Sequence, residues 1–345
     1  MAPEKWSFWV KFILTPVIVC TGIVGNTLSF VVMQSKALRH KSYSRYLSAL
    51  AVFDTLTLII RQVHDVDEYY VMEEGGSVIF KNFDSFGCKM FNFTEHVSYL
   101  MSSWLIVLMA LERLIAVCMP FRKVIIRTQT GAVVTIFIML IAICLSQAFR
   151  VVMIEFSTDY HCGPSDSYLQ LYTDLHIYFY QWSLTFILPV AMVFGFNGMV
   201  LYQIFKIKKE IRKEDKKNRQ YRAVRERHRT TCMLLIVSFT FLGTLLPILT
   251  LTLICHIVMK VKGPAAFGFF TSVKPYLEIA TIISLLNYAI NFFIYILSGK
   301  SFRFELSKVF TRRTYNTRSF TGRSTREEFM RLGQIPNGSS SQLQS

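Results

Sequence analysis

Charged residues are scarce in this sequence. Of its 345 residues 17% are charged and 52% are hydrophobic, whereas about a quarter of a soluble domain is charged. The sequence also lacks an internal repeat, and its seven histidines are scattered without acidic partners. These absences argue against a soluble protein and against a membrane enzyme built on a metal or nucleophile cluster. A transporter or channel, which commonly shows repeats or interrupted spans, remains a distant alternative.

The hydrophobic residues are gathered in long blocks. A helix needs about 20 apolar residues to cross about 30 Å of hydrocarbon, and its backbone polar groups must be bonded within the helix there. The sequence therefore predicts an all-α membrane protein with a bundle of seven transmembrane helices. The expected spans are residues 8–34, 43–63, 88–119, 130–153, 177–205, 229–257 and 272–297.

Basic residues are concentrated in alternate connecting segments. Residues 35–45, 120–129, 206–229 and 298–345 hold 28 of the 38 lysines and arginines but only 7 of the 22 acids. Because cytoplasmic loops of membrane proteins are enriched in basic residues, we expect a multi-pass plasma-membrane protein with the N-terminus extracellular and the C-terminus cytoplasmic. The net charge of +16 then reflects topology and attraction to lipid, not nucleic-acid binding.

This topology divides the chain into three regions. Residues 1–7 are expected to be an extracellular N-terminus, residues 8–310 the membrane bundle, and residues 311–345 a disordered cytoplasmic tail rich in arginine, serine and threonine. The first apolar run is too long for the core of a signal peptide, so we expect a span there and no cleavage.

Two of the seven cysteines stand apart from the others. Cys88 opens the third span, and Cys162 lies in the outward loop before the fifth. Both would lie on the oxidising side of the membrane, where a disulfide would tie this loop across the mouth of the bundle. Two free thiols are the alternative.

The third span carries a polar stripe. Glu95, Tyr99, Ser102 and Arg113 are separated by nearly whole helical turns and therefore share one face over about 27 Å. An ionisable group in a bilayer costs several kcal/mol unless it faces a cavity or a partner, so this face is expected to point inward. The second and seventh spans supply three further polar residues, Asp54, Asn287 and Asn291. The alternative is that these residues form only a structural hydrogen-bond network.

Several short motifs occur in order along the chain. They are Gly25-Asn26, Leu50-Ala51-Val52-Phe53-Asp54, Glu112-Arg113-Leu114, Pro189, Phe241 with Pro247, Asn291-Phe292-Phe293-Ile294-Tyr295, and Ser301-Phe302-Arg303. The last of them resembles the start of an amphipathic helix 8. Together, over about residues 8–310, the chain resembles the rhodopsin-like (class A) G-protein-coupled receptors.

The resemblance implies a signalling receptor with no required cofactor. Glu112, Arg113 and Tyr295 would take part in coupling to a heterotrimeric G protein, and the tail would meet a receptor kinase and arrestin. The resemblance also implies a regulatory sodium ion, because a hard cation needs several oxygen ligands; a protonated Asp54 is the alternative. The expected sodium ligands are Asp54, Ser102, Asn287 and Asn291.

Several positions depart from the pattern of that family. Leu245 replaces the usual tryptophan of the sixth span. Phe292 replaces the proline of the seventh, which we expect to remove a kink. Arg227 stands where an acid often pairs with the conserved arginine, so we expect Glu112 alone to hold Arg113.

The sequence favours a basic peptide as the extracellular ligand. Acidic residues around the expected mouth would concentrate a positive ligand, and Glu95 would pair with its cationic group. Short stretches of the third and seventh spans resemble invertebrate neuropeptide receptors of the FMRFamide type. A monoamine or another small molecule is the alternative ligand. The candidate ligand-binding residues are Glu95, His96, Tyr99, Gln62, Gln181 and Glu278.

Overall fold

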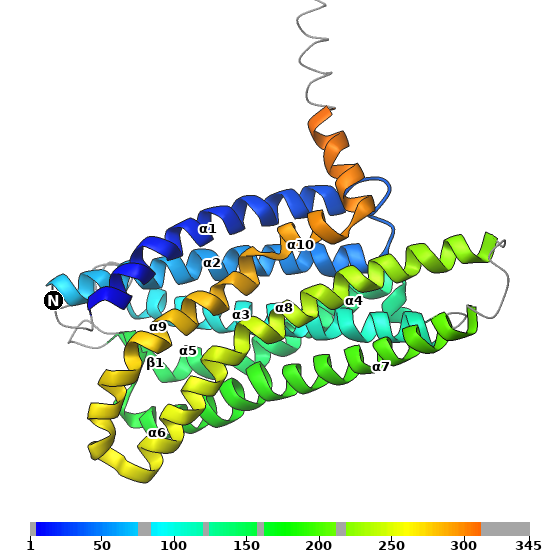
Figure 1. Ribbon diagram of the computed structural model, residues 1–345. Helices are drawn as coiled ribbons and strands as arrows, with labels where there is room; N and C mark the ends of the chain where they lie inside the picture. Colours follow the sequence, from blue (N-terminus) through cyan, green and yellow to red (C-terminus); the bar gives the residue numbers. More distant parts are fainter. Residues whose placement is uncertain (1–4, 75–83, 120–123, 157–161, 212–218, 312–345) are drawn as a thin grey trace, which may run out of the picture.

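Seven long helices run side by side in one elongated bundle (Figure 1). The computed structural model describes residues 5–74, 84–119, 124–156, 162–211 and 219–311. Within these residues seven helices are long and apolar enough to cross a membrane, which confirms the predicted architecture. The expected tail, residues 311–345, lies outside the described residues after its first residue.

The first four spans follow the predicted order, with two short additions. A 3-10 turn, η2 (Ile125–Arg127), precedes the fourth span, and a short helix, α5 (Phe149–Met153), follows it. The second span continues eleven residues beyond its predicted end at residue 63. The long helices are α1 (Lys5–Met33), α2 (Ser42–Glu74), α3 (Asp84–Cys118) and α4 (Gln129–Gln147).

A small hairpin and three further spans complete the fold. Strands β1 (Ile154–Phe156) and β2 (Cys162–Pro164) pair antiparallel. The fifth span is built from a 3-10 turn and three consecutive helical segments, and the seventh from two. In order, these elements are η3 (Asp166–Tyr168), α6 (Leu169–Thr173), η4 (Asp174–Ile187), α7 (Leu188–Ile211), α8 (Arg219–Lys262), η5 (Gly263–Ala266), α9 (Phe267–Ala289) and α10 (Asn291–Ser298).

The outer surface of the bundle is apolar. In α4, the most hydrophobic span, only 17% of the most apolar window is buried inside the protein, and Phe137, Ile138 and Leu145 are largely exposed. Such a surface would be costly in water. The apolar blocks therefore contact lipid on their outer side, while the α3 window is 72% buried at the centre.

The fifth span is wound as a π-helix over η4 (Asp174–Ile187). Its hydrogen bonds reach five residues instead of four, so residues four or five apart share a face. His176, Gln181 and Thr185 consequently line the same cavity, although an α-helical spacing would spread them around the helix. The wide winding thus increases the number of side chains that the fifth span presents to the interior.

The seventh span is interrupted although it lacks the proline. α9 ends at Ala289 and α10 begins at Asn291. At the break, two side-chain amides donate to backbone carbonyls: Asn26 to Tyr288 (3.0 Å) and Asn291 to Asn287 (3.3 Å). The expectation that losing the proline removes the distortion is therefore wrong, because side chains compete here for the carbonyls of the helical ladder.

Close packing of α1 requires two glycines. A Cβ at Gly22 would lie 2.9 Å from the Cβ of Ala289, and a Cβ at Gly25 would lie 2.9 Å from the Cβ of Phe292. Both contacts are shorter than real side chains allow. Gly25, from the first motif of the family pattern, therefore lets α1 touch the interrupted part of the seventh span.

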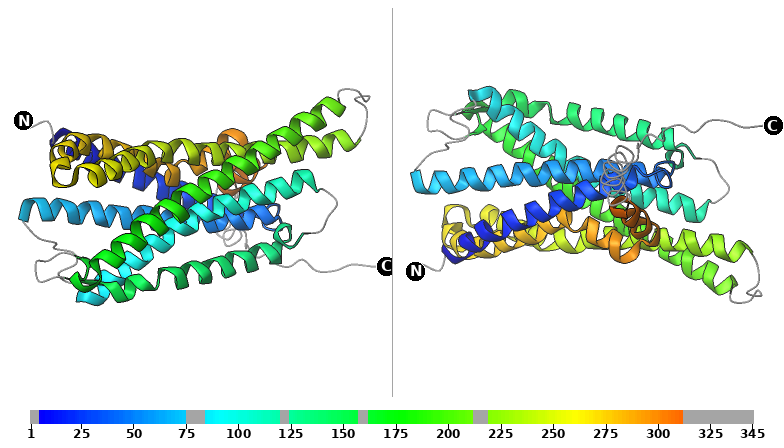
Figure 2. Two further views of the ribbon diagram at one scale, coloured as in Figure 1. Left: turned by 90° about the horizontal axis from the view of Figure 1, so that it is seen from below. Right: turned by 90° about the horizontal axis from the view of Figure 1, so that it is seen from above.

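The two ends of the bundle differ. At one end, which we call the disulfide end, lie the N-terminus and the β1–β2 hairpin (Figures 1 and 2). At the other, the Arg113 end, a further helix covers residues 300–311 and turns away from the bundle (Figure 1). Phe302 of this helix is buried against Tyr295, with 5.5 Å between ring centroids. The sequence predicts this segment as helix 8.

Candidate ligand cavity and its polar network

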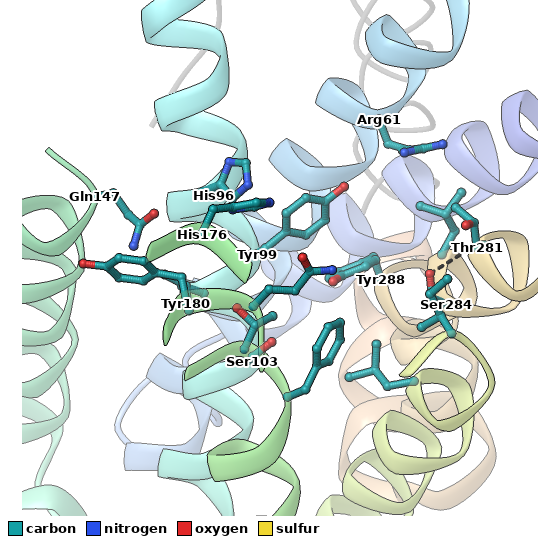
Figure 3. A pocket seen from close by; sticks show the side chains of 17 residues that line it. Arg61, His96, Tyr99, Ser103, Gln147, His176, Tyr180, Thr281, Ser284 and Tyr288 are labelled. Atoms are coloured by element: carbon teal, nitrogen blue, oxygen red, sulfur yellow. Dashed lines mark hydrogen bonds between the residues drawn. The ribbon is translucent and has the colours of Figure 1, made fainter. Parts of the chain in front are cut away.

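A cavity of about 240 Å³ opens among the helices in the half of the bundle near the disulfide end (Figure 3). Its apolar wall includes Leu245, the residue that replaces the family's tryptophan. A leucine is smaller than an indole, so the missing tryptophan leaves room here. The polar residues around it, from five different helical segments, are Arg61, His96, Tyr99, Ser103, Gln147, His176, Tyr180, Gln181, Thr185, Thr281, Ser284 and Tyr288.

The candidate ligand residues fall into two groups. His96, Tyr99 and Gln181 line the cavity. Glu95 and Gln62 are not part of its lining, and Glu95 is attracted electrostatically to two arginines that flank the cavity.

Glu278, the remaining candidate, also lies outside the cavity lining. It is only 7% exposed, and its Oε2 atom has no hydrogen-bond partner. No lysine or arginine among the described residues forms an ion pair with it. It precedes Thr281 of the cavity wall by three positions, so both share one face of α9.

Most of the acidic rim expected from the sequence is already neutralised by the protein. Asp65 forms ion pairs with Lys11 of α1 (3.2 Å) and Arg61 (2.7 Å), and Lys11 also binds Glu68 (2.5 Å). His64 approaches the two carboxylates to within 4.8 Å, a set that could hold a metal ion, but the Lys11 ammonium already bridges both acids. This cluster joins α1 to α2, which leaves less negative charge for a ligand than composition suggests.

Arg150 of α5 is the largest fully buried side chain, with no exposed surface. Its guanidinium lies over the rings of Phe149 (4.9 Å) and Tyr172 (5.5 Å). No carboxylate among the described residues lies within ion-pair distance. Four neutral acceptors receive its hydrogen bonds instead: Gln147 (2.7 Å), Asn92 (3.2 Å), Tyr172 (2.6 Å) and His176 (2.8 Å).

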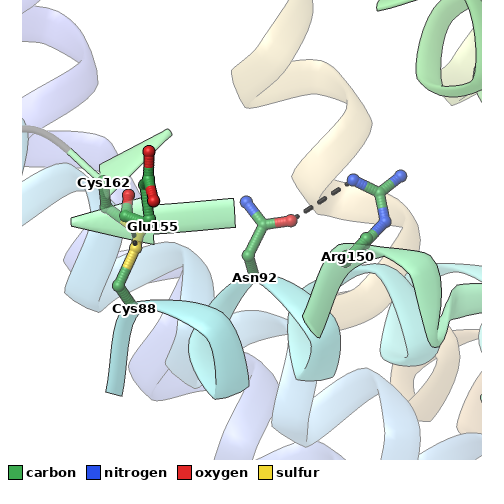
Figure 4. The surroundings of a disulfide bond; sticks show 5 residues. All are labelled: Cys88, Asn92, Arg150, Glu155 and Cys162. Atoms are coloured by element: carbon green, nitrogen blue, oxygen red, sulfur yellow. Dashed lines mark hydrogen bonds between the residues drawn. A yellow bond between two sulfur atoms is a disulfide. The ribbon is translucent and has the colours of Figure 1, made fainter. Parts of the chain in front are cut away.

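A disulfide closes the loop beside this arginine. Cys88 and Cys162 are bonded, with Cα atoms 5.7 Å apart, which confirms the predicted pair. The bond ties the β1–β2 hairpin to the second turn of α3, one helical turn from Asn92 and its hydrogen bond to Arg150 (Figure 4). The loop is therefore held on one side of the cavity by a covalent bond and by a buried network.

A polar network lies below the cavity. Asp54 has no exposed surface; its Oδ1 accepts from the Ser102 hydroxyl (2.5 Å) and its Oδ2 from the Asn291 amide (2.7 Å). Asn287, also buried, lies one turn before Asn291. The Asp54 carboxylate and the Ser102 hydroxyl thus converge, with the Asn291 amide nitrogen facing the carboxylate. Carboxylate and hydroxyl oxygens are ligands that fit a hard cation such as sodium.

Arg113 is buried near the opposite end. It binds the neighbouring Glu112 through Nε (2.5 Å) and Nη2, and its guanidinium lies 5.3 Å from the ring centroid of Tyr43. Glu112 in turn accepts from the Ser42 hydroxyl (2.8 Å). The expected Glu112–Arg113 pair is therefore present; the Arg227 side chain lies outside the described residues. The sequence did not indicate the role of Ser42 and Tyr43.

Comparisons with known proteins agree with this arrangement. The chain matches the family described as 7 transmembrane receptor (rhodopsin family) over residues 25–295. A galanin-like G-protein-coupled receptor of Caenorhabditis elegans is 30% identical over 131 residues, which are 38% of this chain and 28% of that protein. Neuropeptide receptor 18 of the same organism is 22% identical over 205 residues, 54% of this chain and 41% of the relative.

A third relative from that organism, a putative G-protein-coupled receptor, is 26% identical over 334 residues, 85% of this chain and 71% of its own length. The chain thus spans less than half the length of the first two relatives. The family match alone covers well over half of this chain. The relatives are named as G-protein-coupled or neuropeptide receptors. The chain therefore belongs to the rhodopsin family of seven-transmembrane receptors, which are receptors and not enzymes.

Proposed function

We propose that this receptor binds an extracellular peptide in the cavity and activates a heterotrimeric G protein at the Arg113 end. The observation that carries the proposal is the continuity between the two ends. Tyr99 and Tyr288 line the cavity with ring centroids 5.9 Å apart. Each lies one turn from a member of the Asp54 network, Ser102 and Asn291 respectively. A ligand that moves the two tyrosines therefore acts on the helices that carry Arg113 and Tyr295.

A peptide fits the size and lining of the cavity. A volume of about 240 Å³ is below the roughly 300–1,000 Å³ of typical sites for whole drug-sized ligands. The end of a peptide, with one or two side chains, would fill it while the rest lies across the mouth. The name of one relative, Neuropeptide receptor 18, supports the same ligand class.

A signalling assay tests this proposal. Cells that express the receptor are exposed to a library of short peptides ending in Arg-Phe-amide, and G-protein activation and ion flux are recorded together. Activation of a G protein without receptor-dependent ion flux is expected. A response to monoamines alone would contradict the peptide assignment, and an ion current in the absence of G protein would contradict the whole proposal.

Glu278 is expected to bind the basic group of the peptide. Its carboxylate is buried without an ion pair, whereas Glu95 is attracted to Arg61 and Arg150. A ligand cation at Glu278 therefore gains a partner without displacing one. Glu278→Gln should weaken the potency of an Arg-Phe-amide agonist at least about tenfold, the value of one such contact.

Glu95→Gln is the matched comparison for this prediction. If Glu95 is the partner, as the sequence suggests, its replacement should produce the larger loss. The assay measures agonist concentration–response curves at equal receptor density on the cell surface. Unchanged potency in both variants would exclude an acidic contact with the ligand.

We also propose that the Asp54 network binds a regulatory sodium ion. The oxygens of Asp54 and Ser102 already lie together, and a hard cation would neutralise the buried carboxylate. Replacing sodium chloride by choline chloride should raise agonist affinity about threefold or more, as expected when a bound ion favours the resting state. Asp54→Asn should abolish this sodium dependence in radioligand binding; a persistent dependence would place the ion elsewhere.

The orientation in the membrane and the cytoplasmic partners extend this proposal. We propose that the disulfide end faces the cell exterior, in the plasma membrane, because a disulfide forms in an oxidising compartment. A receptor kinase and arrestin would act on the tail, and the basic residues of 206–229 would contact anionic lipid.

A further inference from the structure

The two histidines of the cavity have fixed hydrogen-bonding roles. His176 accepts a hydrogen bond from Arg150 through Nδ1 (2.8 Å). A guanidinium only donates, so Nδ1 carries the lone pair and the neutral ring carries its hydrogen on Nε2. His96 approaches the backbone carbonyl of Asn92 through Nδ1 (2.8 Å). A carbonyl only accepts, so this ring has its hydrogen on Nδ1 and a lone pair on Nε2.

The cavity therefore contains a donor beside an acceptor. Both rings line it (Figure 3) and their centroids are 5.1 Å apart. Neither Nε2 atom has a hydrogen-bond partner among the residues that the structure describes. Gln147, which is buried at the cavity wall, is a second donor: its Oε1 accepts from Arg150, and its amide nitrogen has a second hydrogen besides the one that reaches Ser146 (3.2 Å).

Arg150 strengthens the two donors. Its positive charge is buried with no carboxylate of the described residues within ion-pair distance, although Glu95 attracts it from farther away, so it polarises the His176 ring and the Gln147 amide that accept from it. A ligand oxygen that binds these donors would therefore meet polarised N–H groups. The Nε2 lone pair of His96, by contrast, repels a second oxygen and favours an N–H group.

We propose that this wall of the cavity binds a primary carboxamide of the ligand, with its oxygen on His176 and Gln147 and its nitrogen on His96. A carboxylate would meet the donors but not the His96 lone pair, and burying its formal charge would cost more. The carboxamide can come from an amidated peptide end or from an asparagine or glutamine side chain. This inference rests on the proposed ligand cavity but not on coupling to a G protein.

Small probes that share one body test the end group directly. Binding to the purified receptor in detergent is measured by saturation-transfer NMR titration with N-acetyl-L-phenylalaninamide and with the free acid N-acetyl-L-phenylalanine. The amide should bind at least about tenfold tighter, the effect of one well-made hydrogen bond. N-acetyl-L-glutamine methylamide, whose primary carboxamide is in the side chain, tells the two sources of the group apart.

Variants locate the binding group. His176→Phe keeps a ring against Tyr172 (5.5 Å) but loses the donor, and should weaken the amide about tenfold; His176→Gln can accept from Arg150 and donate to the ligand, and should restore binding. His96→Phe removes the proposed acceptor for the ligand N–H. The protein itself loses the hydrogen bond from His96 to the Asn92 carbonyl, which lies within the same helix. Val152→Ala, in the exposed part of α5 and outside the cavity lining, should change nothing.

The outcomes separate this inference from the proposed function. Because ligand binding is measured without a G protein, a receptor that does not activate a G protein would leave the carboxamide proposal intact. Equal affinity for the amide and the acid overturns it, as does absence of binding by both carboxamide probes to a folded wild-type receptor. If His176→Phe fails to fold, His96→Phe decides: unchanged affinity for the amide overturns the proposal, and a loss supports it.

Discussion

Replacing Arg150 with methionine is expected to lower the free energy of unfolding by more than about 3 kcal/mol. Each buried polar group left without a partner costs about 1–3 kcal/mol, and this substitution would remove the donor of four groups at once. Methionine retains much of the apolar volume between the two aromatic rings, so the loss would report on hydrogen bonds more than on packing. The affected acceptors belong to Asn92, Gln147, Tyr172 and His176.

Two further variants interpret the result. Arg150→Lys keeps the charge but offers three donors in place of five, and should fall between the wild type and the methionine variant. Val152→Ala is the control, since Val152 lies in the same short helix and is 65% exposed. Thermal and denaturant unfolding of the purified receptor in detergent measure the effect. A loss below about 1 kcal/mol in the methionine variant would mean that the four acceptors find other partners.

The bundle itself could be predicted from the sequence because the membrane restricts the possibilities. A lipid-spanning chain must form helices of a given length, so apolar block length was sufficient to find all seven. The boundaries were less predictable, since α2 continues to Glu74. Asp65 lies just beyond the predicted end at residue 63, and its ion pairs to Lys11 of α1 and to Arg61 make a buried charge compatible with a continuing helix.

The importance of Arg150 could not be inferred in the same way. In the sequence, an arginine near the end of the fourth apolar block indicates only the boundary of a span. Its partners are Gln147, three positions before it, and residues 22 to 58 positions away. Hydrogen bonds between elements so far apart in the chain depend on tertiary packing, which periodicity does not reveal.

The third span shows both what helical periodicity predicts and where it stops. The spacing predicted that Tyr99 and Ser102 share one inward face, and in the structure Tyr99 lines the cavity while Ser102 donates to Asp54. It also placed Glu95 on that face, but the structure gives this carboxylate two nearby arginines. Which residues share a face follows from sequence, whereas which charges are already compensated depends on other helices.

Replacing Glu112 with glutamine is expected to raise agonist-independent activity about tenfold. The Glu112–Arg113 pair is buried, with side chains 3% and 8% exposed. Breaking a buried ion pair by removing one charge costs about 3–5 kcal/mol. If the resting state alone loses about 1.4 kcal/mol of this, the population of the active state rises tenfold. Basal nucleotide exchange in membranes with equal receptor density is the measurement, and an unchanged basal rate would show that the pair does not hold the resting state.

Ser42 separates the effect of the charge from the effect of its position. Ser42→Ala keeps both charges and removes only the hydrogen bond to Glu112 (2.8 Å), so a smaller rise of about threefold is expected, since a neutral-to-charged hydrogen bond contributes less than the ion pair. Arg113→Ala should abolish agonist-stimulated exchange while leaving ligand binding intact, because the group proposed to meet the G protein is gone.

Coupling between two contacts in one network is non-additive. Because Ser42 acts on Arg113 only through Glu112, the double variant Ser42→Ala/Glu112→Gln should match Glu112→Gln alone. A sum of the two single effects would instead show that Ser42 restrains the resting state independently, through the start of α2.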